Sequence, residues 1–143
     1  MYVVILGAGR IGASTARWLV AADHEVATVD QDEPKCAALD SELGGISVVG
    51  DGTEAGVLAR AGVNRADIFI ATTNSDEDNM VACQLARHHF GVSYTVSLVG
   101  GPEYERLFNL LEIGVIINTT DLIADRLKEV VGGRLVEEVG SLG

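Results

Sequence analysis

The chain has 143 residues and 48% of them are hydrophobic, enough for the core of one domain. Its 21 acidic and 10 basic residues give a net charge of -11, which excludes the basic footprint of a nucleic-acid-binding protein. No apolar run approaches the roughly twenty residues of a membrane span, and no basic targeting segment opens the chain. We therefore expect a cytoplasmic protein without direct membrane insertion.

Apolar runs alternate with segments of helical period from one end of the chain to the other. Strands are expected at residues 2–6, 25–29, 46–49, 68–71, 94–99 and 115–117, and helices at 10–22, 33–43, 54–61, 76–89, 102–111 and 121–131. Such alternation predicts an α/β, Rossmann-like fold, a doubly wound parallel six-stranded sheet with helices on both faces.

The last predicted helix follows a candidate cap at Thr120 and carries a broad apolar stripe. The stripe consists of Leu122, Ile123, Leu127, Val130 and Val131. Its width fits either a partner surface or a helix lying on its own sheet, and the sequence leaves both open. Residues 133–143 show strand-like alternation without a place in that sheet. We expect them to be a tail, or the start of a truncated C-terminal region, after a domain of residues 1–132.

A glycine-rich loop, Gly7-Ala8-Gly9-Arg10-Ile11-Gly12, directly follows the first predicted strand. The first glycine permits a sharp turn, the second lets a pyrophosphate approach, and the third lets helix and strand pack closely. The helix that follows offers free N–H groups and the positive end of its dipole to phosphates. The pattern predicts a nucleotide site, and its alternative is a glycine turn without a ligand.

Asp30 ends the second predicted strand, where a carboxylate can accept hydrogen bonds from both ribose hydroxyls. The same charge repels a 2′-phosphate, and no arginine follows to receive one. These features favour NAD or NADH, or alternatively ATP or ADP, over NADP. The alternative for Asp30 is an ordinary acid in a turn before a helix.

The loops after the first four strands should meet at one edge of the sheet, since ligands bind at the carboxyl ends of parallel strands. Arg10 could contact phosphates or remain solvated; Asp51 could contact the adenine edge or form a helix cap with Glu54. Residues 72–74 could lie beside the ribose and phosphates or cap the next helix. The candidate binding residues are Gly7, Gly9, Arg10, Ile11, Gly12, Asp30, Gln31, Asp51, Gly52, Thr53, Thr72, Thr73 and Asn74.

The sequence offers no catalytic centre. No tyrosine has a lysine four positions on, and His24, His88 and His89 fall at helix ends away from the predicted site. Cys36 and Cys83 fall in predicted helices without metal-ligand spacing. We therefore expect a binding protein without a metal and not an enzyme. The alternative is the cofactor-binding half of an NAD-dependent oxidoreductase.

Taken together, these motifs resemble the nucleotide-binding domain of the potassium-conductance regulator (RCK or KTN) family, which includes the TrkA-type subunits of potassium uptake systems. The resemblance extends over nearly the whole chain. It rests on the glycine loop, His24-Glu25-Val26, Asp30-Gln31-Asp32, Gly50-Asp51-Gly52-Thr53, the segment from Ala71 to Asn79, and Pro102-Glu103-Tyr104 with Leu107-Phe108.

Two departures accompany the resemblance. Many relatives carry an arginine on the fifth strand, where this chain has Thr95-Val96-Ser97-Leu98-Val99 followed by Gly100-Gly101. The C-terminal ligand-binding domain usual in the family is absent, which favours a trimmed chain over a free-standing module.

The resemblance implies a regulator peripheral to the inner face of the cell membrane. Its homodimers, or a larger ring, would assemble on a membrane potassium transporter or channel subunit and change its gating when NAD(H), ATP or ADP binds. By the same resemblance, Gly7, Gly9, Arg10 and Gly12 would hold phosphates, Asp30 the ribose, Asp51 and Thr53 the adenosine side, and Thr73 and Asn74 would close the pocket.

Overall fold

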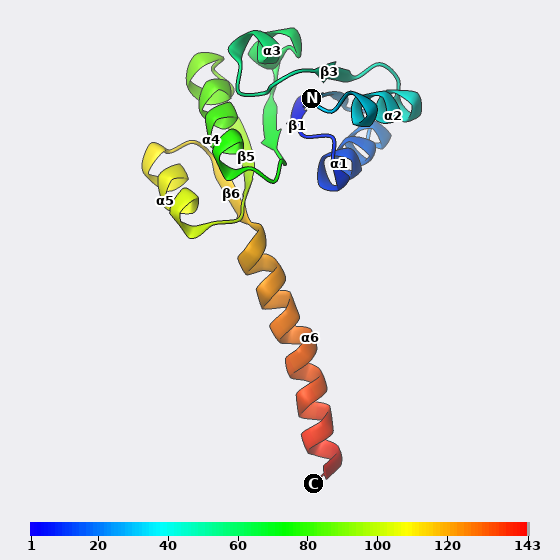
Figure 1. Ribbon diagram of the computed structural model, residues 1–143, viewed down its shortest axis with the longest axis vertical. Helices are drawn as coiled ribbons and strands as arrows, with labels where there is room; N and C mark the ends of the chain where they lie inside the picture. The colour runs from blue at the N-terminus through cyan, green and yellow to red at the C-terminus, as the bar shows by residue number, and fades with distance from the viewer. Residues whose placement is uncertain (143) are drawn as a thin grey trace.

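The computed structural model describes residues 1–142, with side chains described to residue 137. The strands are β1 (Tyr2–Leu6), β2 (Glu25–Asp30), β3 (Ser47–Val49), β4 (Ile68–Ala71), β5 (Tyr94–Val99) and β6 (Val115–Asn118). The helices are α1 (Arg10–Ala21), α2 (Glu33–Leu43), α3 (Ala55–Arg60), α4 (Asp76–Gln84), α5 (Pro102–Leu111) and α6 (Thr119–Leu142), with short turns η1 (Val63–Arg65) and η2 (Leu85–His89) (Figure 1).

The strands form one 6-stranded parallel sheet in the order β3-β2-β1-β4-β5-β6. The strand order reverses beside β1, because the chain adds β2 and β3 on one side and β4, β5 and β6 on the other. This arrangement confirms the predicted doubly wound, Rossmann-like fold. Loops at the carboxyl ends of β1 and β4 therefore face the position where such folds bind ligands.

Strand β1 lies at the centre and is buried on both faces, as its continuous apolar sequence predicts. Val3 and Ile5 pack under α1 and α2, while Val4 and Leu6 pack in the core beneath α3, α4 and α5. This alternation follows from the two-residue period of a strand. It gives the sheet two separate cores, one on each face.

The β5–β6 half of the sheet is covered by helices on one face only. Helices α4 and α5 pack there, whereas α1 and α2 lie over β1, β2 and β3. On the other face, the register pairs residue 96 with 115 and residue 98 with 117. We call this half-buried to exposed strip the open sheet face; it consists of Val96, Leu98, Val115 and Ile117.

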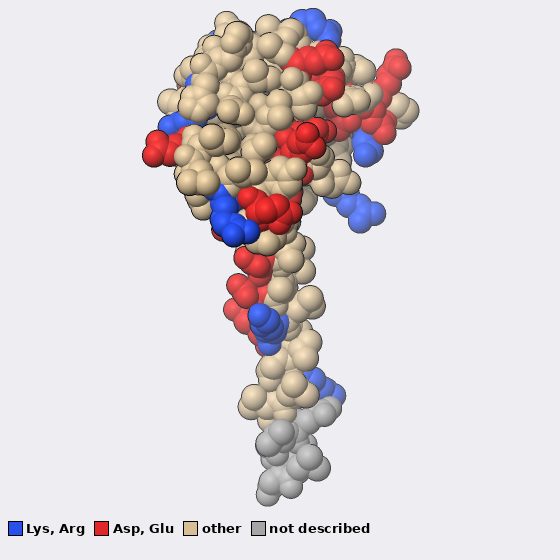
Figure 2. All heavy atoms as spheres, turned by 60° about the vertical axis from the view of Figure 1, so that its left-hand side comes forward, with Lys and Arg blue, Asp and Glu red and all other residues tan. Residues whose placement is uncertain are grey.

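Helix α6 projects away from the globular part instead of covering the open sheet face (Figure 1). The large apolar side chains described on α6 are all more than half exposed: Leu122, Ile123, Leu127, Val130, Val131, Leu135 and Val136. In its upper part, Figure 2 shows acidic side chains along one edge of the helix and uncharged surface along the other. Of the two alternatives for the stripe, the one in which it lies on its own sheet is therefore wrong. No described helix, α6 included, is long and apolar enough to cross a membrane.

Several predicted boundaries differ from the structure. The last predicted helix begins at Thr119, where the side chain of Asn118 accepts from the Asp121 N–H at 3.0 Å, so Thr120 is not the cap. The helix also continues through residues 132–142, so the strand-like prediction there is wrong; residue 143 lies outside the described residues. An Arg134–Glu137 pair one turn apart supports the helix.

Two other predicted helices are shorter than expected. The third begins at Ala55, one residue later than predicted, and ends at Arg60. The fourth is α-helical only to Gln84 and ends in the π-helical turn η2. Helix ends are the least certain part of any sequence-based assignment, because the last turn often changes its hydrogen-bond pattern.

Candidate functional site

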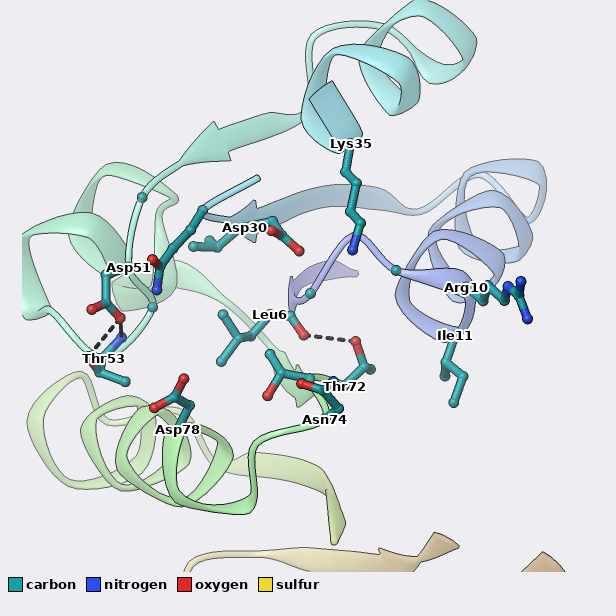
Figure 3. A pocket seen from close by; sticks show the side chains of 17 residues that line it. Leu6, Arg10, Ile11, Asp30, Lys35, Asp51, Thr53, Thr72, Asn74 and Asp78 are labelled. Atoms are coloured by element: carbon teal, nitrogen blue, oxygen red, sulfur yellow. Dashed lines mark hydrogen bonds between the residues drawn. The ribbon is translucent and has the colours of Figure 1, made fainter. Parts of the chain in front are cut away.

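A cavity of about 440 Å³ lies at the carboxyl ends of the central strands, between α1, α2 and α4 (Figure 3). Its volume falls in the range of small-molecule sites. Every candidate binding residue except Gly12 lines it: Gly7, Gly9, Arg10, Ile11, Asp30, Gln31, Asp51, Gly52, Thr53, Thr72, Thr73 and Asn74. The four loops that carry the candidate residues therefore meet at one cavity.

The three glycines of the loop do different structural work. Gly7 has a positive φ of 110°, a conformation that favours glycine, and its N–H donates to the Val29 carbonyl at 2.8 Å. A Cβ at Gly12 would overlap the Gly7 carbonyl oxygen, so the third glycine sets the close packing of α1 on β1. A Cβ at Gly9 would meet no protein atom within 4 Å, because it would point into open space.

Helix α1 begins at Arg10 with no side-chain cap on its N-terminus. Its first N–H groups therefore lack the side-chain acceptor that a cap residue provides. The open end of the helix stands beside Gly9 at the wall of the cavity. This geometry suits an anion, which would accept from these groups and interact with the helix dipole.

Asp30 is fixed by two backbone donors at the end of β2. Its Oδ2 accepts from Ala8 N at 2.8 Å, and its Oδ1 accepts from Asp32 N at 2.8 Å. The first bond ties the carboxylate to the glycine loop, and the second sets the turn that leads to the Asp32 cap of α2. Each carboxylate oxygen can accept a further bond, so a ribose hydroxyl could still bind here.

Asp51 and Thr53 form a compact turn after β3. Asp51 Oδ1 accepts from Thr53 N at 2.9 Å and from Thr53 Oγ1 at 2.7 Å. The Thr53 hydroxyl first, and its N–H second, lower the pKa of the Asp51 carboxyl below its usual range. Glu54 is the N-cap residue of α3 and makes no side-chain cap bond, so the alternative for Asp51, a capping pair with Glu54, does not form.

The loop after β4 is held by its own threonines. Thr72 Oγ1 donates to the Leu6 carbonyl at 2.8 Å, directly beneath Gly7 and Gly12. Thr73 Oγ1 accepts from Ser75 N at 3.2 Å, and Ser75, not Thr72–Asn74, caps α4 through the Asp78 N–H. The capping alternative for these three residues is therefore wrong.

Asn79 joins this loop to the end of β5. The residue is fully buried, and its amide donates to the carbonyls of Thr73 and Leu98, both at 3.0 Å. Its side-chain oxygen accepts from Thr73 N at 3.2 Å. One residue thus satisfies backbone groups on two elements at once, which fixes the floor of the cavity against β5.

The rim is more open than the floor. Arg10, Ile11, Gln31 and Asn74 are exposed. In Figure 3 the Arg10 guanidinium points outward from α1, away from the cavity. The predicted contact of Arg10 with a phosphate requires a rotation of its side chain.

The cavity also includes residues that the sequence analysis did not identify. Leu6, Val29 and Gly50 come from strand ends, while Lys35 and Asp78 come from the first turns of α2 and α4. The positions of Lys35 and Asp78 in the sequence could have identified them, because the first turn of a helix that follows a parallel strand faces the ligand edge of the sheet. In residues 1–137, no cluster of three or more His, Cys, Asp or Glu could hold a metal ion.

Sheet topology, glycine loop and cavity define the chain as a Rossmann-like domain of the nucleotide-binding class. Its sequence matches the TrkA-N domain over residues 3–119, and the chain belongs to this family. The resemblance noted in the sequence is confirmed.

Relatives in this family include a Trk system potassium uptake protein TrkA homolog from Methanothermobacter thermautotrophicus, 32% identical over 143 residues. The TrkA of Halomonas elongata is 33% identical over 147 residues. The chain spans 66% of the first relative and 31% of the second.

Solved structures agree with this assignment. The RCK domain of GsuK has a TM-score of 0.79 and 26% identity, covering 93% of this chain and 28% of that one. GsuK was also solved with ADP, at 25% identity, a TM-score of 0.79 and coverage of 93% of this chain and 34% of that one. A structure of the GsuK channel with NAD has 26% identity and a TM-score of 0.71 over 81% of this chain and 21% of that one.

Proposed function

We propose that this chain is the nucleotide-binding regulatory domain of a potassium uptake system or channel. An adenosine nucleotide, NAD(H) or alternatively ATP or ADP, binds the cavity, and its binding controls potassium transport by a membrane partner. The domain acts at the cytoplasmic face of the membrane and catalyses no reaction. Residues 1–132 form this domain, and α6 continues beyond them to Leu142.

One observation carries the proposal: an uncapped helix N-terminus and a fixed carboxylate face the same cavity. The α1 terminus at Gly9 suits phosphates, and Asp30 suits ribose hydroxyls. The ligands in two GsuK structures, ADP and NAD, both carry these two groups on an adenosine. Asp51, with its lowered pKa, remains a charged acceptor for the adenine amino group.

Two uncovered apolar surfaces within residues 1–137 indicate how the chain assembles. The stripe of α6 and the open sheet face are both apolar, and neither covers the other within one chain. We infer a homodimer in which α6 of one copy packs on the second copy. Burial of such faces at roughly 25 cal/mol per Å² gives the association its driving force.

A polar route links the cavity to the base of α6. Asn79 ties the cavity loop to Leu98, near the end of β5. Thr119 and Thr120, the first residues of α6, donate to the carbonyls of Val99 and Gly100 at 3.4 and 2.9 Å. A ligand that fixes the cavity loop can therefore bias the direction of α6, by as much as its affinity differs between the two arrangements.

The rival function, the cofactor half of an oxidoreductase, would have to take its proton donor from Lys35 or from the carboxyl groups of the cavity, since the usual His, Tyr or Cys is missing from the lining. No histidine, tyrosine, cysteine or serine of the described side chains lines the cavity. Incubation of the chain with NAD or NADH and a panel of small alcohols and acids distinguishes the two. Sustained turnover would contradict the regulatory function.

Calorimetric titration with NAD, NADH, ATP and ADP, together with the mass of the chain in solution, tests the proposal directly. We expect saturable binding of at least one nucleotide by a dimer, without turnover. A folded chain that binds none of the four would contradict the proposal.

A further inference from the structure

Lys35 gives the cavity a cation that the glycine-loop pattern does not specify. It lies in the first turn of α2, where its N–H donates to the Asp32 side chain at 3.1 Å, so its backbone is fixed. Its side chain lines the cavity and extends toward the β1–α1 loop (Figure 3). Lys35 and Lys128 are the only lysines of the chain.

The charge balance of the cavity gives this lysine its importance. Three carboxylates line the wall, from Asp30, Asp51 and Asp78, and they repel a phosphorylated ligand. The other lining cation, Arg10, points away from the cavity (Figure 3). Lys35 is thus the cationic side chain that faces the space beside the glycine loop.

Lys35 also forms no ion pair within residues 1–137, although the chain has a net charge of -11 and three carboxylates share its cavity. Its ammonium group therefore keeps its donors available for a ligand. An anion placed at the uncapped end of α1 would have backbone N–H groups on one side and this ammonium on the other.

We propose that Lys35 is a specificity-determining residue that contacts the phosphate of the bound nucleotide from the α2 side, so that the site selects nucleotides over the nucleoside. This inference rests on the proposed function, because it concerns the same cavity. Lys35 supplies part of the affinity for ADP and none of the affinity for adenosine. The contact is electrostatic, so it weakens with added salt.

The test compares adenosine, AMP and ADP as ligands of the unmodified chain, Lys35→Ala, Lys35→Arg and Lys128→Ala. Lys128→Ala, on α6, is the matched control because it removes the same charge far from the cavity. We expect Lys35→Ala to weaken ADP binding about three- to tenfold, to leave adenosine unchanged, and to flatten the salt dependence. Lys35→Arg should restore most of the loss, and Lys128→Ala should bind like the unmodified chain.

The outcomes separate the two proposals. If the unmodified chain binds ADP and Lys35→Ala binds it equally well, the role of Lys35 is refuted and the proposed function stands. If Lys35→Ala loses affinity equally for ADP and adenosine, the proposed phosphate contact is also refuted, because the lysine would then act only through the fold. If the unmodified chain binds no adenine nucleotide, both proposals fail.

Discussion

The globular part of the chain and helix α6 both carry apolar stripes, yet they bury them very differently. In β1, Val4 and Ile5 are fully buried, whereas Leu127 on α6 is 57% exposed. Close packing explains the stability of the first region, while the second has few tertiary contacts of its own. An apolar stripe therefore indicates that a face needs cover, but not which element or molecule covers it.

The largest expected effect is in the packed region. Gly12→Val places side-chain atoms against the Gly7 carbonyl and the Thr72 hydroxyl. We expect a loss of about 3 kcal/mol or more in the free energy of unfolding, measured by urea denaturation. Gly132→Ala on α6 is the control: its Cβ meets nothing within 4 Å, and alanine favours the helix. Equal destabilisation of both variants would contradict the difference in packing between the globular part and α6.

Asn79→Ala sharpens the comparison at the floor of the cavity. The substitution leaves buried backbone groups of Thr73 and Leu98 without their partner. We expect a loss of about 2–4 kcal/mol in unfolding free energy by the same measurement. Asn74→Ala, at the exposed rim, should change stability by less than about 0.5 kcal/mol. An Asn79 variant as stable as the Asn74 variant would contradict this role.

Leu127→Glu tests the exposed stripe of α6. Because Leu127 lacks a neighbour that buries it, its replacement should leave the stability of the single chain unchanged. The dimer dissociation constant, measured by sedimentation equilibrium, should rise tenfold or more, about 1.4 kcal/mol. The control is Lys128→Glu, which places a glutamate at the neighbouring position. It should raise the dimer dissociation constant less than Leu127→Glu does. A dimer that tolerates Leu127→Glu would place the interface elsewhere.

Asp30→Ala tests the ligand side of the cavity. We expect nucleotide binding to weaken by about 1–3 kcal/mol in calorimetry, because the fixed acceptor of ribose hydroxyls is lost. The substitution also frees the N–H groups of Ala8 and Asp32, so a thermal melt must show that the chain remains folded. Unchanged affinity in a folded variant would mean that the carboxylate serves only the glycine loop.

The buried thiol of Cys83 should make the stability of the folded chain depend on pH. Burial raises the pKa of its thiol to about 12, whereas the unfolded chain exposes a thiol with an ordinary value near 9. The buried thiol's contribution to the free energy of unfolding is therefore fully present below about pH 9, and it is lost as the pH rises from there toward 12. We expect Cys83 to account for about 1 kcal/mol of lost stability between pH 8 and pH 10. Cys83→Ala should reduce that loss; an identical pH profile would refute the assignment.

The sheet and most of the cavity were predictable from the sequence. Strand β1 is a continuous apolar run, and such runs are typical of central parallel strands. The glycine loop and Asp30 were identifiable because each position has a steric or electrostatic requirement. Lys35 and Asp78 were missed because they lie on helices, where charged residues usually face solvent.

The direction and length of α6 could not be predicted. Its apolar stripe fits the chain's own sheet as well as a partner, since hydrophobic patterns are not directional. The Gly132-Gly133 pair suggested an end, because glycine disfavours a helix interior. The helix continues because its next residues, among them Arg134, Leu135 and Glu137, favour helix.

The most direct test of the central claim is amide hydrogen exchange with and without saturating ADP or NADH. We expect slower exchange at residues 7–12, 30–32, 51–53 and 72–74, the four segments that meet at the cavity. Slower exchange confined to other surfaces, or no change at these segments in a chain that binds the nucleotide, would show that the ligand site lies elsewhere.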